Sequence, residues 1–216
     1  MAKRGVPSTA TDAEVRALLE RHQCPVPFHE VRTRLLGSIA TPLPFASPMK
    51  AVEGLWGGKM PVFTSIDAAN ELIGALIMGL WNQLSRHQDR KTPFRLTRSG
   101  VAATRESVAA LALTRRQELD GFINGLFGRE ESIDLPERAH RGLTVLGEMR
   151  ALIAAVQDVT SDAGKPATIV DLEATIRNMR ELTLIAEREI HAIVLSCKRA
   201  REQMLAGLPT RRPTLH

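Results

Sequence analysis

The residues best suited to metal chemistry lie close together near the N-terminus. His22, Cys24 and His29 offer three soft-metal ligands within a short stretch of chain. A structural zinc site needs a fourth ligand, and the proline-rich spacing here follows none of the usual zinc patterns. We therefore expect no bound metal, with Cys24 as a small buried residue and both histidines as surface groups.

Catalytic groups are just as scarce. Glu130, Glu131 and Asp134 form an acidic loop that could supply a carboxylate pair for acid–base chemistry. Carboxylates just before a helix more often only complement its dipole. The chain has no nucleophile signature, and the glycines of segment 54–59 lack the spacing of a phosphate-binding loop. The sequence predicts no catalytic residue, no cofactor and no enzymatic activity, and a small-ligand binding protein or enzyme is the least favoured alternative.

Positive charge is concentrated in segment 86–116, which contains eight basic residues and only two acidic residues, Asp89 and Glu106. Such a segment can contact phosphates in a salt-dependent way that does not read base sequence. Phe94 is its only aromatic residue, so base stacking is poorly supplied. The alternative is a solvated connection whose cations pair with acidic faces elsewhere. The candidate anion or nucleic-acid contacts are Arg86, Arg90, Lys91, Arg95 and Arg98.

The composition favours helices. The chain of 216 residues is 44% apolar, and it has six Phe, two Trp and no Tyr. It is rich in Leu, Ala, Arg and Glu, which are good helix formers, and poorer in the β-branched and aromatic residues that strands prefer. We expect an all-α protein. A net charge of +5 favours anionic partners to a modest degree.

We expect a protein of bacterial type, and its cysteines and apolar segments indicate a cytoplasmic location. Cys24 and Cys197 lie far apart, so a disulfide framework is not expected. The N-terminal residues have no apolar run of the kind found in signal peptides. The longest apolar stretch, residues 72–81, is too short to span a bilayer. The sequence therefore predicts no contact with a membrane.

Hydrophobic periodicity predicts a bundle of about six helices. A third helix, from about Thr64 to Leu84, is apolar around much of its circumference, and we expect it to be central and buried. Gly74 and Gly79 on that helix are expected to allow close helix contact. The predicted order is a disordered tail (1–10), a bundle domain (11–160), a long C-terminal helix packing on the bundle or on a partner (161–206) and a second tail (207–216). The helices are expected at about 11–21, 28–40, 64–84, 104–126, 136–158 and 169–205, with a further turn around 49–55.

The last of these helices has an uninterrupted heptad pattern, the pattern of coiled coils. At about 1.5 Å per residue it would be roughly 50 Å long. Its apolar stripe predicts a homo-oligomer through this helix or, equally, an antiparallel partner within the same bundle. The candidate interface residues are Ile176, Met179, Ala186, Ile190, Ile193 and Cys197.

Residues 28–155 resemble the YecA/YgfB-like family. The resemblance is carried by Val52-Glu-Gly-Leu-Trp-Gly-Gly58, by Pro61-Val-Phe63, by Leu80-Trp-Asn-Gln-Leu84 and by Glu118-Leu-Asp-Gly-Phe-Ile-Asn-Gly-Leu126. The cysteine-rich metal knuckle of some members is absent, and the long heptad helix stands in its place. The resemblance implies an all-helical fold and a protein without an established biochemical activity, and its motifs are structural rather than catalytic.

The leading functional hypothesis is a non-enzymatic protein-interaction module, with a possible regulatory role and an unknown protein partner. The alternative is a nucleic-acid-associated protein that uses the basic segment 86–116. The first hypothesis rests on the helical surfaces and on the uninterrupted heptad pattern of the last helix, and the second rests on the basic segment.

Overall fold

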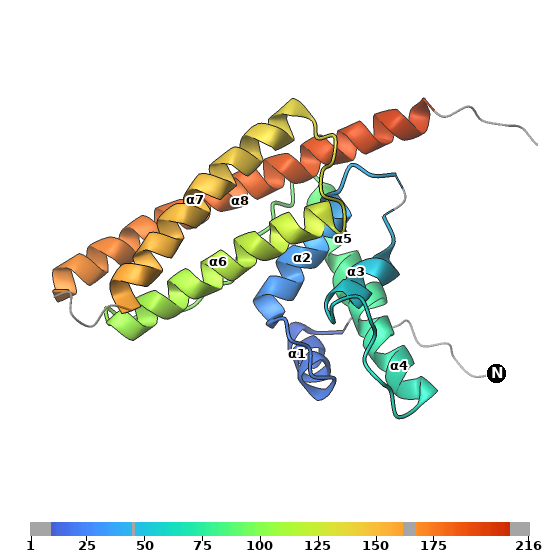
Figure 1. Cartoon of the computed structure of the whole chain (residues 1–216), viewed down its shortest axis with the longest axis horizontal. Helices are drawn as coiled ribbons and strands as arrows, with labels where there is room; N and C mark the ends of the chain where they lie inside the picture. Colours follow the sequence, from blue (N-terminus) through green and yellow to red (C-terminus); the bar gives the residue numbers. More distant parts are fainter. Residues whose placement is uncertain (1–9, 45, 162–166, 208–216) are drawn as a thin grey trace, which may run out of the picture.

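The chain folds as an all-α bundle. The computed structural model describes residues 10–44, 46–161 and 167–207, and no strand occurs within these ranges. The tails predicted for 1–10 and 207–216 therefore lie almost wholly outside the described residues. The last three helices form an elongated layer, and the N-terminal helices gather toward one end of it (Figure 1). None of the described helices combines the length and apolar character needed to cross a membrane.

Helix boundaries in the N-terminal part follow from local capping. Helix α1 (Asp12–Arg21) begins with a capping box in which Thr11 and Glu14 satisfy each other's backbone N–H groups. Pro27 precedes α2 (Phe28–Ala40). Helix α3 (Pro48–Gly54) has proline in its first turn, where the missing N–H costs nothing. These boundaries agree with those predicted from sequence.

The predicted third helix is continuous from Ile66 to Gln88, but its hydrogen-bonding pattern changes along its length. It consists of α4 (Ile66–Ile73), a π-helical stretch (Gly74–Trp81), α5 (Asn82–Ser85) and a 3-10 turn (Arg86–Gln88). The stripe residues Leu72, Leu76, Leu80 and Leu84 are buried as expected. Ile66 is 80% exposed and Met78 is 60% exposed, so the expectation of a buried helix holds for one side only.

The elongated layer is built from α6 (Arg105–Phe127), α7 (Glu137–Ser161) and α8 (Ile169–Ala206). Helix α6 starts at the Thr104 cap and ends at Gly128, whose φ of 62° suits glycine. With 38 residues, α8 is about 57 Å long and runs along the whole layer (Figure 1). It packs against α2, α6 and α7 of its own chain.

The centre of the fold is the crossing of α2 and α6, which is the most extensive contact between two elements. A Cβ atom added at Gly125 would lie 1.9 Å from the carbonyl oxygen of Arg34, and one at Gly37 would lie 2.2 Å from that of Phe122. Glycine is therefore required at both positions for the two backbones to approach so closely. The prediction of a close contact at Gly74 is wrong, because a Cβ there would meet no atom within 4 Å.

Candidate functional site: a basic surface along α8

An extended segment connects the 3-10 turn to α6 and lies against the helical layer. We call residues 89–103 the strap. The strap has no regular secondary structure, yet Phe94 and Leu96 within it are fully buried. Its backbone is paired with side chains of the helices it crosses: the Leu96 N–H donates to Glu187 at 3.0 Å, and the Thr97 N–H donates to Glu118 at 2.7 Å. The strap is thus a fitted part of the fold and not a loosely solvated loop.

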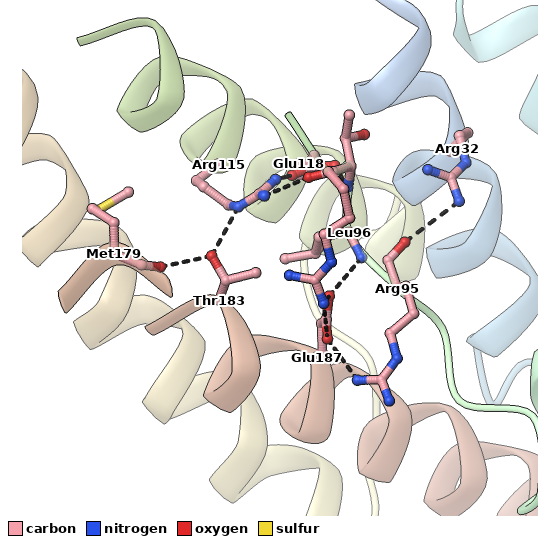
Figure 2. A network of polar contacts seen from close by, with 10 residues as sticks. Arg32, Arg95, Leu96, Arg115, Glu118, Met179, Thr183 and Glu187 are labelled. Atoms are coloured by element: carbon pink, nitrogen blue, oxygen red, sulfur yellow. Dashed lines mark hydrogen bonds and ion pairs between the residues drawn. The ribbon is translucent and has the colours of Figure 1, made fainter. Parts of the chain in front are cut away.

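The carboxylate of Glu118 also takes part in a buried ion pair. Its side chain and that of Arg115 are almost fully buried, and the two groups form a close salt bridge within α6. The Arg115 guanidinium also donates to the Thr183 hydroxyl of α8 at 2.9 Å and to the Thr97 carbonyl (Figure 2). Arg115 therefore joins α6, α8 and the strap, and its charge is compensated inside the protein.

Glu187 is the second buried carboxylate of this network. Its side chain is 1% exposed, whereas those of its partners Arg95 and Arg98 are 58% and 56% exposed. Arg95 contacts one carboxylate oxygen at 2.7 Å, and Arg98 contacts both, at 2.8 and 2.9 Å. One negative charge thus holds two arginines at the surface (Figure 2). A net positive charge remains there.

The structure places the five predicted anion contacts along the strap and just before it. Arg86, Arg90 and Lys91 are exposed, and none pairs with a carboxylate of the described residues. Arg95 and Arg98 both pair with the single carboxylate of Glu187, which compensates only one of their two positive charges. The alternative prediction, that the cations pair with acidic groups elsewhere in the fold, thus holds for Arg95 and Arg98. It does not hold for Arg86, Arg90 and Lys91.

A second row of cations comes from α8 itself. Arg177, Arg180, Arg188 and Arg199 are exposed, and they pair with no carboxylate in the described part of the chain. Their spacings of three, eight and eleven residues place them on one face of the helix. Sequence analysis missed this row because it followed only the apolar positions of the heptad. The arginine spacing itself was the signal that could have revealed it.

The two rows run antiparallel to each other. Gln88 near the start of the strap accepts from Lys198 and Arg201 near the end of α8, and Glu187 binds the middle of the strap. Arg98 and Val101 then share a pocket with Met179 and Arg180. We call the two rows, together with Lys198, the basic surface: Arg86, Arg90, Lys91, Arg95, Arg98, Arg177, Arg180, Arg188, Lys198 and Arg199.

Two hollows mark the ends of the basic surface. A cleft of about 800 Å³ lies where Arg90, Arg138, Lys198 and Arg199 surround Leu195. In this cleft Arg138 is paired with Glu189, and Lys198 with Glu202. At the other end, a pocket of about 290 Å³ opens between the strap, α6 and α8. Its lining is mostly apolar, with arginine at the rim.

A buried aromatic cluster supports the start of the strap. Phe94 is fully buried. The Cζ atom of Arg32 lies 5.0 Å from the centre of its ring, and the His87 ring packs edge to face against it with the ring centres 5.2 Å apart. Burial lowers the pKa of His87, and the positive charge of Arg32 lowers it further, against the hydrogen bond to the Thr92 carbonyl. Phe94 is thus a core residue, and a nucleic-acid base cannot reach its ring to stack on it.

The predicted interface stripe lies inside the chain. Each residue of the stripe is at most 5% exposed, because α2, α6 and α7 cover that side of α8. Of the two arrangements left open by the heptad pattern, the structure has the one within the bundle. Burial raises the pKa of the Cys197 thiol to about 12. The stripe comprises Ile176, Met179, Ala186, Ile190, Ile193 and Cys197.

The other sequence candidates do not form a site. His29 hydrogen-bonds Gln117 at 2.8 Å, and His22 packs edge-on against Phe63. Burial raises the pKa of Cys24, which makes it a poorer metal ligand. No group of three possible metal ligands occurs among the described residues. Glu130, Glu131 and Asp134 are exposed.

Comparisons of the chain with protein-family models, curated proteins and solved structures give no match. The resemblance to the YecA/YgfB-like family therefore stays a prediction. Its motifs have structural roles in this chain. Trp56 donates to the His22 carbonyl at 3.0 Å, Gly57 and Gly58 form a turn with positive φ, and Gly121 and Gly125 lie at the α2–α6 crossing.

Proposed function

We propose that the protein is a helical protein-interaction module that binds an acidic segment of a partner protein on its basic surface. The observation that carries the proposal is the pair of antiparallel cation rows on the strap and α8. Most of these cations have no acidic partner within the described chain, and Glu187 holds Arg95 and Arg98 in place. Positioned charges of one sign attract and orient a partner of the other sign.

Two features favour an acidic protein segment over nucleic acid. Leu184 is 50% exposed between Arg180 and Arg188, and Leu195 lies beside Arg199. Such apolar groups suit the side chains of a protein and have no counterpart in a phosphate backbone. Phe94 is buried, so bases find no aromatic ring to stack on.

The proposed location is a reducing cytoplasm. Cys24 and Cys197 are both free thiols, which fits a compartment where disulfides rarely persist. We do not propose self-association through the heptad stripe, because those side chains already form the core of the chain.

Binding can be measured by fluorescence anisotropy with three labelled probes: a Glu/Asp- and Leu-containing peptide, its Gln/Asn counterpart, and a duplex DNA of equal charge. We expect the acidic peptide to bind, and its affinity to fall with added salt. The double variant Arg188→Glu/Arg199→Glu should weaken binding by about tenfold or more, which corresponds to ~1.4 kcal/mol.

The matched control is Lys50→Glu/Lys59→Glu, which changes the net charge equally at exposed sites in the N-terminal part. It should alter the dissociation constant by less than about twofold, as expected for screened distant charges. Binding of DNA but not of the acidic peptide, with sensitivity to the α8 substitutions, would assign the surface to nucleic acid. Equal loss in both double variants would mean that only net charge matters.

A further inference from the structure

The pocket at one end of the basic surface has the properties of an anchoring site. Its volume is about 290 Å³. The apolar side chains of Val101, Leu111, Met179 and Leu184 form most of its wall, and Ser99, Thr183 and three arginines complete the lining. This volume lies at the lower limit for small-molecule pockets, and it suits one large apolar side chain. The pocket draws on the strap, α6 and α8 together, so it exists only when the strap is docked.

Charge surrounds the mouth of this pocket. Arg98 and Arg180 are exposed lining residues, Arg98 is oriented by both oxygens of Glu187, and Arg180 has no acidic partner among the described residues. The buried Arg115 also lines the pocket, but its charge is compensated by Glu118. An apolar side chain entering here is therefore flanked by two cations, and acidic neighbours on the same ligand would complement them.

Two further cations of α8, Arg188 and Arg199, extend from the pocket toward the C-terminal end of the helix. Along α8, Arg180 and Arg199 are separated by nineteen residues, or about 29 Å. Arg188 lies between them, on the same face of the helix. An extended peptide would cover this distance with about nine residues at ~3.3 Å each.

We infer that this pocket is the anchor site for one large apolar side chain of a protein segment whose acidic residues lie along α8 toward Arg199. The inference rests on the proposed function and specifies the partner's sequence: a Leu or Phe flanked by Asp or Glu, with further acidic residues up to about nine positions away. Interfaces of this kind obtain most of their affinity from a few side chains that fill pockets.

The test compares two twelve-residue acidic peptides that differ only at the anchor position, one with Leu and one with Ala. The wild-type protein should bind the Leu peptide about tenfold more tightly than the Ala peptide. In Leu184→Asp this preference should fall below about twofold, because a carboxylate then lines the pocket wall. Leu184 is half exposed, so the substitution is compatible with folding. The control Val170→Asp, at a 70% exposed position in the first turn of α8, should retain the full preference.

A second readout locates the side chain directly. Met179 lies in the pocket wall and is 1% exposed, so the ¹³C-labelled methyl group of Met179 should shift on addition of the Leu peptide and not of the Ala peptide. Equal affinity for both peptides would overturn the anchor and leave the proposed function standing. A preference that survives Leu184→Asp without a Met179 shift would place the anchor elsewhere. The double variant Arg188→Glu/Arg199→Glu should bind both peptides more weakly but should still prefer the Leu peptide. This result is expected because the cations and the pocket contribute separately to binding.

Discussion

The Glu187 carboxylate on α8 accepts the backbone N–H of Leu96 in the strap at 3.0 Å, and the two residues are 91 positions apart in the chain. Leu96 is 1% exposed, so its N–H has no access to water. The same carboxylate holds Arg95 and Arg98 at the surface. A single buried acid thus determines both where the strap lies and where two of its positive charges are presented.

Removing this acid should loosen the strap. Glu187→Ala leaves the Leu96 N–H buried without an acceptor, which costs about 1–3 kcal/mol. We expect that loss in urea unfolding, together with faster amide exchange at residues 94–97. Glu187→Gln keeps an acceptor for the N–H and should lose less. Unchanged exchange in the alanine variant would show that the buried Phe94 and Leu96 side chains hold the strap unaided.

The α2–α6 crossing should not tolerate a methyl group. Gly125→Ala places a Cβ against the Arg34 carbonyl oxygen, so the helices must separate, at a cost of about 3 kcal/mol. Gly147→Ala is the matched control, because a Cβ there meets no atom within 4 Å. It should stabilise α7 by about 0.5–1 kcal/mol. Thermal denaturation of the two variants under one condition checks both signs.

The two thiols should react slowly in the folded protein. Burial raises the pKa of Cys197 to about 12 and raises that of Cys24 as well. At pH 8 both are therefore protonated, and the thiolate is the nucleophile. Mass spectrometry after brief maleimide treatment should show Cys197 unmodified in the native protein and both cysteines modified in guanidinium. Rapid native labelling of Cys197 would contradict its burial between α8 and the bundle.

His87 should make the fold sensitive to mild acid. Its pKa is lowered from the ordinary value of 6.5, first by burial and then by Arg32 and His191. The unfolded chain therefore takes up a proton near pH 6.5 while the folded chain does not. This contribution to stability is present above pH 6.5 and is lost as the pH falls below it.

The variant His87→Asn removes this titration. Between pH 7.5 and 5.5, the urea midpoint of the wild-type protein should fall by more than that of the variant. Other carboxylates and histidines titrate in both proteins, so the difference between the two slopes isolates His87. Parallel slopes would show that the pKa of His87 is the same in the folded and the unfolded chain, which would contradict the lowering of its pKa by burial.

The apolar stripe of α8 should govern stability and leave the molecular mass in solution unchanged. Ile190 is fully buried, and Ile190→Ala should cost about 2–5 kcal/mol by leaving a cavity. Val170→Ala, at an exposed position of the same helix, should cost less than about 0.5 kcal/mol. Light scattering should give equal masses for the wild type and both variants. A larger wild-type mass that Ile190→Ala reduces would favour assembly through the stripe.

The local pattern of residues was enough to predict the helices. Proline, glycine and capping residues such as Thr11, Thr104 and Gly128 act within a few positions of the chain, and they mark the helix ends found in the structure. The periodicity of apolar residues likewise determined the all-α class and the buried face of α8. The π-helical stretch of the third helix escaped prediction because its i to i+5 bonding leaves no simple pattern in sequence.

Tertiary structure alone decided which residues meet. The sequence identified Arg95 and Arg98 as cations, but only the fold brings Glu187 beneath them, and only the fold turns Phe94 inward. It also showed that the α8 stripe packs within its own chain, because a heptad pattern specifies an apolar face and not the helix that covers it. The basic surface has the same origin: two arginine rows far apart in sequence become one surface because buried carboxylates bind the strap antiparallel to α8.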